Sequence, residues 1–171
     1  MQRVQDNSPR PEFFLGPRWS GSQGSPRVVT WSLATDGITI PSLIGENQAS
    51  NTLFSRMDAL FAAQGGRATW VQRIQETFDR WEAVSGIDFV RVTAPGVDWD
   101  DGASWGSLGG TTRGDIRIAM KRLDLVGGVT VVSTFPGVGD VVLDRAEDWS
   151  TPANLHRFLR NTLAWGTGIA S

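Results

Sequence analysis

The alternation of apolar and polar residues predicts strands and helices in succession along the chain. Residues 28–33, 87–92 and 115–120 are β-branched or alternate apolar with polar positions, as strands do. Residues 129–135 and 141–143 predict two further strands, separated by a Pro- and Gly-containing turn at 136–139.

Helices are predicted over residues 51–64 and 68–84, and a further helix begins at Thr151, where Pro152 suits the first turn. The 68–84 segment repeats apolar residues at the spacing of one helix face, which we expect to be buried: Trp70, Val71, Ile74, Phe78, Trp81 and Val84. The last helix has a similar face made of Leu155, Phe158, Leu159 and Leu163.

This order of elements predicts an α/β fold, with a twisted, mixed and mostly parallel sheet and two long helices packed on it. Residues 1–26, rich in Pro, Gly, Ser, Gln and Arg, predict a flexible lead-in, and residues 27–171 predict one domain or most of one. Residues 38–45 and 93–114 are expected to be loops, the second of them long and acidic.

Composition excludes several kinds of site. The chain has 171 residues and a net charge of −2, which favours neither nucleic acid nor an anionic membrane as partner. It has no cysteine and one histidine, His156, so disulfides and zinc sites with two histidines from one chain are excluded. The sequence has no apolar run long enough for a membrane span and no signal-peptide core, so we expect a cytoplasmic protein or a precursor whose start is missing.

The order of these segments, from about Arg27 to Ala164, resembles the catalytic domain of matrixins. Matrixins are the metzincin zinc endopeptidases that include the matrix metalloproteinases, and the bacterial secreted relatives are the more similar. The most specific segments are FDRWEAVSGIDF at 78–89 and GDVVLDRAEDW at 139–149, followed by a helix reading NLHRFLRNTLA. The resemblance implies hydrolysis of peptide bonds by zinc-activated water, a peptide or protein partner and an extracellular location.

The zinc-binding motif of that family, H-E-x-x-H-x-x-G-x-x-H, is replaced in this chain. Its two helical histidines lie one turn apart and bind one zinc ion, and the glutamate takes a proton from zinc-bound water. Trp165 matches the first histidine, Gly166 the glutamate and Ile169 the second histidine. Because tryptophan and isoleucine offer no lone pair to zinc, we expect no zinc and no peptidase activity.

Two explanations fit this replacement. The chain is either a natural pseudo-enzyme or a truncated or frame-shifted copy of an active gene, and the second is favoured. Codons for residues 165–169, read two bases later, can spell Gly-His-x-His-x. The alternative functions are a non-catalytic domain that holds an extended peptide beside the strand at 129–135, and a fragment without a stable fold.

Of the other metal sites implied by the resemblance, the structural zinc site has lost its histidines and the calcium site has two of its carboxylates. Val132 and Val142 occupy positions that supply histidines to a structural zinc, so that zinc is not expected. Asp144 and Glu147 match calcium-binding carboxylates, although calcium takes six to eight oxygens. The alternative is that these two carboxylates charge the approach to the following helix.

The loop at 93–114 contains two further groups of candidate residues. Asp98, Asp100 and Asp101 are a second calcium candidate, with solvated turns as the commoner role of such loops. Trp99 and Trp105 are the tryptophans considered for ligand contact.

Overall fold

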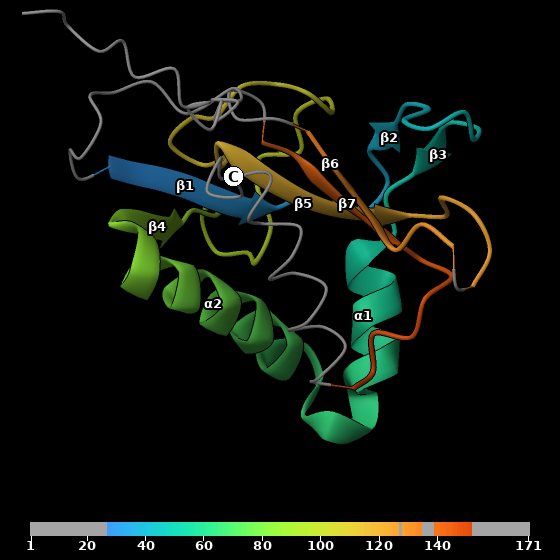
Figure 1. Ribbon diagram of the computed structural model, residues 1–171, viewed down its shortest axis with the longest axis horizontal. Coiled ribbons are helices and arrows are strands. Elements are labelled where there is room, and N and C mark those ends of the chain that lie inside the picture. Colours follow the sequence, from blue (N-terminus) through green and yellow to red (C-terminus); the bar gives the residue numbers. More distant parts are fainter. Residues whose placement is uncertain (1–26, 127, 135–138, 152–171) are drawn as a thin grey trace, which may run out of the picture.

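The structure is a computed structural model that describes residues 27–126, 128–134 and 139–151. These residues form a five-stranded sheet in the order β4-β1-β5-β7-β6 (Figure 1). Strands β4, β1, β5 and β7 are parallel, and β6 pairs antiparallel with β7. The strands are β1 (Arg27–Leu33), β4 (Ile87–Arg91), β5 (Ile116–Lys121), β6 (Val131–Ser133) and β7 (Val141–Asp144).

Two helices cover one face of the sheet. Helix α1 (Leu53–Phe61) continues into a 3-10 turn, η1 (Ala62–Gln64), and is followed by α2 (Gly66–Ser85). In Figure 1 both helices lie on the same side of the sheet, and the short hairpin of β2 (Thr39–Ile40) and β3 (Ala49–Ser50) lies on the other side. Gly65 and Gly86, at the two ends of α2, have the left-handed φ angles of 101° and 69° that favour glycine.

The main core lies between the sheet and the helices. Trp31 of β1 stacks on Phe78 of α2 with ring centroids 4.6 Å apart, and Trp149 is fully buried in the same cluster. A smaller cluster on the opposite face of the sheet contains Ala34, Ile40, Ala119, Leu123 and Val142. The sheet is therefore buried on both faces.

The predicted fold class is confirmed at this level: an α/β fold with a mostly parallel mixed sheet and two helices. The prediction of a loop at 38–45 holds for residues 41–45 but was wrong for Thr39 and Ile40, which form β2. A two-residue strand is too short to show any periodicity, so no pattern could have revealed it. Val84 was predicted to be buried but is 75% exposed. It lies in the last turn of α2, beyond Phe78 and the partly buried Trp81, where the helix leaves the core.

Strand β5 also differs from its prediction. Its alternation suggested one buried and one polar face, yet all six of its residues are buried. Arg117 and Lys121 remain inside because polar groups from the loops meet them on the second face of the sheet. A central strand covered on both sides can keep a charged residue only where such partners exist.

The predicted lead-in at 1–26, His156, and the replaced zinc positions Trp165, Gly166 and Ile169 lie outside the described residues. In the part of the chain that the structure describes, no helix has the length and apolar character needed to cross a bilayer.

Candidate functional site

The open edge of the sheet at β6 is the first part of the candidate site. Among the described residues, strand β6 has a neighbour on one side only, β7. The N–H of Asp144 donates to the carbonyl oxygen of Thr130, and the N–H of Thr134 donates to that of Asp140. Because backbone groups alternate in direction along an antiparallel strand, those of Val131 and Ser133 point away from β7. This edge can therefore accept another extended chain.

Val132 and Val142, the positions of the expected structural-zinc histidines, are direct cross-strand neighbours of β6 and β7. Val142 is 1% exposed, and Val132 packs against the same small cluster. The two side chains share one face of the sheet, but both are apolar and pack in the small cluster.

Asp144 and Glu147, the calcium candidates, lie at the end of β7 and in the turn that follows. The Oδ1 atom of Asp144 accepts hydrogen bonds from the N–H groups of Leu123 and Ala146, both at 3.0 Å. Glu147 is 9% exposed. Asp144 thus holds the turn together through Oδ1, while its Oδ2 atom is buried and has no hydrogen-bond partner among the described residues. Among the described residues, no group of three or more histidine, cysteine or carboxylate side chains is arranged to hold a metal ion.

The three aspartates of the long loop point to different arginines. Asp98 pairs with Arg67 and Arg91, while Asp101 pairs with Arg113 at 2.8 Å. Asp100 is 1% exposed and accepts a 2.7 Å hydrogen bond from Nε of Arg117. The structure does not bring these carboxylates together as one site. Asp98 and Asp100 fasten the loop to α2 and to the sheet, whereas Asp101 pairs within the loop.

Arg117 organises the second face of the sheet. Besides Asp100, its guanidinium donates to the carbonyl oxygens of Ser104 and Ala103, at 2.9 and 3.0 Å. It also lies 5.5 Å from the ring centroid of Trp105. All these contacts belong to the loop at 100–106, so one buried arginine fixes that loop over β5.

The two loop tryptophans have different surroundings. Trp99 packs into the main core, edge-to-face with Phe54 at 5.4 Å between centroids, which makes it a packing residue. Trp105 lines a cavity of about 340 Å³ together with Ile38, Thr39, Pro41, Gly102 and Ser104. Of the two, only Trp105 lies where a small molecule could meet it.

Asp140 is a residue that sequence reasoning missed. It is 2% exposed, and its Oδ1 atom accepts from the backbone N–H of Arg117 at 3.1 Å. Burial raises its pKa to about 7, against the opposing attraction of Arg117. A glycine followed by an aspartate before an apolar strand resembles an ordinary turn, so only the three-dimensional neighbours reveal it.

Comparison with known proteins adds no assignment. No protein-family profile matches the chain, and no curated protein is significantly similar to it.

Proposed function

We propose that this chain is a matrixin-type metalloendopeptidase domain whose zinc site has been replaced, and that it does not cleave peptides as written. In the family, zinc-activated water hydrolyses the peptide bond. Trp165, Gly166 and Ile169 supply neither the two zinc ligands nor the base. We further propose that the fold is metzincin-like and that the chain is a truncated or frame-shifted copy of an active gene.

One observation carries the proposal. Positions 132 and 142, which the resemblance pairs at one metal, are direct cross-strand neighbours in β6 and β7. Further support comes from the mostly parallel sheet, its antiparallel edge strand and the two helices on one face.

Zinc content tests the proposal directly. The purified chain is loaded with zinc, desalted and analysed for metal, and we expect far less than one ion per chain. The variant Trp165→His/Gly166→Glu/Ile169→His supplies two of the three protein ligands of a catalytic zinc, with the spacing that the family motif gives them. It should therefore bind zinc more tightly than the parent in competition with a chelator, whereas the control Trp165→His/Gly166→Glu, with one new histidine, should not. One zinc ion retained per parent chain would contradict the proposal.

The encoding DNA decides between the two origins. We expect a neighbouring frame, read from the codon for Leu155 onward, to spell H-E-x-x-H-x-x-G-x-x-H. In that case the activity belongs to the repaired gene. If no frame contains the motif, the chain is a natural pseudo-enzyme.

The open edge of β6 favours a second function, the binding of an extended peptide without cleavage. A bound strand would hydrogen-bond to the outward backbone groups of Val131 and Ser133. Peptides selected from a display library should bind the parent chain and shift the amide NMR signals of these two residues. Ser133→Pro removes one outward N–H and should weaken binding, whereas Ser133→Ala keeps that group and should not. Shifts that avoid β6 would contradict this function.

We also propose that Asp144 and Glu147 contribute to a calcium site, completed by backbone or water oxygens because two carboxylates are too few. Added calcium should raise the melting temperature of the parent chain, and Asp144→Asn should abolish the increase. An equal response to magnesium and calcium would point to general charge screening instead.

A further inference from the structure

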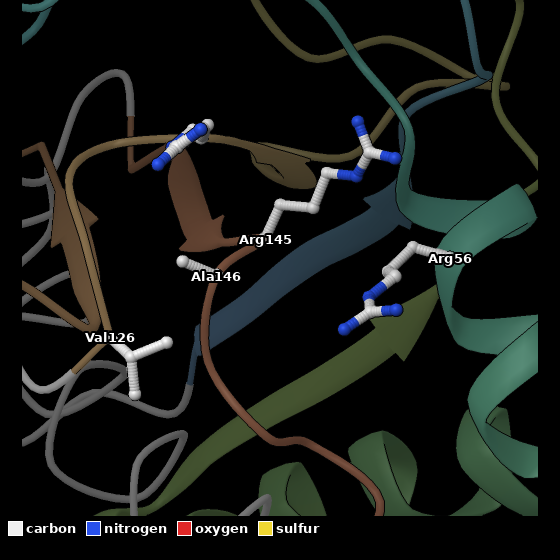
Figure 2. Close-up of a pocket in the computed structure, with 5 residues that line it drawn as sticks. Arg56, Val126, Arg145 and Ala146 are labelled. Carbon is white, nitrogen blue, oxygen red and sulfur yellow. The ribbon is translucent and has the colours of Figure 1, made fainter.

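A pocket on the side of α1 is lined by three arginines from three separate parts of the chain. Arg56 belongs to α1, Arg122 directly follows β5, and Arg145 directly follows β7. Val126 and Ala146 complete the lining of a cavity of about 460 Å³. We call this the arginine pocket. In Figure 2 the side chain of Arg145 extends toward α1, and that of Arg56 extends from α1 toward the chain after β7.

The fold fixes the position of the pocket. Lys121 and Asp144, the last residues of two parallel strands, are partners in register. The N–H of Arg145 donates to the carbonyl oxygen of Lys121 at 2.9 Å, and the N–H of Thr52 donates to that of Met120. The pocket therefore lies at the carboxyl ends of β5 and β7, beside the start of α1. In open α/β sheets this is where ligands usually bind.

The arginines of the pocket lack the partners that other arginines of this chain have. Arg67, Arg73, Arg91, Arg113 and Arg117 each form an ion pair with a carboxylate. Within the described residues, Arg56, Arg122 and Arg145 form none. Moreover, Nε of Arg56 is buried without a hydrogen-bond partner, which is costly for a charged donor. The pocket thus presents a deficit of negative charge.

Acidic groups of the neighbouring segments hydrogen-bond to other groups, although Oδ1 of Asp124 is buried without a hydrogen-bond partner among the described residues. The Asp36 carboxylate accepts from the N–H groups of Phe54 and Ser55, so the start of α1 is already capped. Oδ2 of Asp124 accepts from the N–H of Val129 at 2.7 Å. The pKa of Asp148 is lowered by its hydrogen bonds to Ser150 and, to a smaller degree, by the charge of Arg56.

We propose that the arginine pocket binds a small polyanion that carries more than one phosphate or sulfate group. Guanidinium groups pair in two-pronged fashion with such oxyanions, and three of them around one cavity suit several anionic groups better than a single carboxylate. The volume is that of a small-molecule site. This inference does not depend on the function proposed above.

Calorimetric titration of the full chain tests the proposal, with orthophosphate, pyrophosphate and tripolyphosphate at constant ionic strength. We expect saturable binding that tightens with the number of phosphates. A disulfated disaccharide forms the second arm, and tighter binding than pyrophosphate would identify a sulfated ligand. Absence of saturable binding for all four probes at millimolar concentration would overturn the proposal.

Matched variants separate the pocket from general charge. Arg56→Gln and Arg145→Gln should each weaken pyrophosphate binding by about 10- to 100-fold, the value expected for a lost charged hydrogen bond. Arg80→Gln, at an exposed position of α2 outside the pocket, makes the same change in net charge and should leave binding unchanged. Melting curves verify that each variant is folded. Equal weakening by Arg80→Gln would overturn the proposal.

Discussion

Arg117 and the arginine pocket place the same side chain in opposite circumstances. Arg117 is 0% exposed, and the loop at 100–106 surrounds its guanidinium with a carboxylate, two carbonyl oxygens and an aromatic ring. In the pocket, three guanidinium groups share one cavity and form no ion pair with the described residues. A buried cation needs partners within the fold to offset its lost hydration, whereas an accessible cation is hydrated and can bind a ligand. The comparison therefore gives a criterion: a structural arginine has its partners within the fold, whereas a binding arginine lacks a carboxylate partner there.

The largest effect is expected when Arg117 loses its carboxylate. Asp100→Ala leaves a buried cation unpaired and should lower the free energy of unfolding by about 3 to 5 kcal/mol, measured by urea denaturation. Asp101→Ala is the control, because its pair with Arg113 is partly exposed and should contribute about 1 kcal/mol or less. Equal losses in the two variants would show that Asp100 does not hold the loop through Arg117.

Asp140, beside Arg117, should make stability depend on pH. Its pKa is about 7 when folded and 3.8 as an ordinary side chain, so between these values the folded state binds more protons. The contribution of the neutral Asp140 carboxyl to stability is then fully present below about pH 3.8 and is lost as pH rises through 7. Asp140→Asn cannot ionise and should be more stable than the parent at pH 8, by up to about 4 kcal/mol, with little difference at pH 4. Parallel pH profiles of the two proteins would contradict this assignment.

Lys121, the second buried cation of β5, tests whether the rule is general. Its Nζ donates to the carbonyl oxygens of Pro41 and Asn47 and pairs with Glu46. Burial alone would raise the pKa of Glu46, but the hydrogen bond from Lys121 and those from the backbone lower it to about 2. This pair stabilises the fold above about pH 4.5 and is lost as pH falls through 2.

Glu46→Gln should therefore cost about 1 to 2 kcal/mol at pH 6, less than the loss of Asp100, because two carbonyl oxygens remain around Lys121. The difference from the parent should shrink as pH falls from 4.5 to 2, which thermal melts can follow. A constant difference over that range would mean that the charge of Glu46 is unimportant.

The sequence revealed these regions unequally. The five strands of the main sheet and α2 were predictable because their apolar patterns extend over several residues, as in the face formed by Trp70, Ile74 and Phe78, whereas the two-residue strands β2 and β3 were not. The buried Arg117 was not, since its alternation with isoleucines is that of a half-exposed strand. The arginine pocket was also missed, because Arg56, Arg122 and Arg145 are far apart in sequence and converge only where parallel strands end. Local sequence pattern predicts helices and strands, whereas the contacts of a side chain depend on how those elements are arranged in the fold.

Substitutions in the arginine pocket are expected to have the smallest effect on stability, although they should weaken anion binding strongly. Arg56→Gln and Arg145→Gln should each change the free energy of unfolding by about 0.5 kcal/mol or less in dilute buffer, because neither arginine forms an ion pair with the described residues. Removing one of three neighbouring cations should even stabilise the chain slightly at low salt, and this gain should disappear at about 0.5 M NaCl, where repulsion is screened. Denaturation curves at the two salt concentrations measure both. A loss of unfolding free energy comparable to that of Asp100→Ala would show that these arginines are structural residues, as Arg117 is.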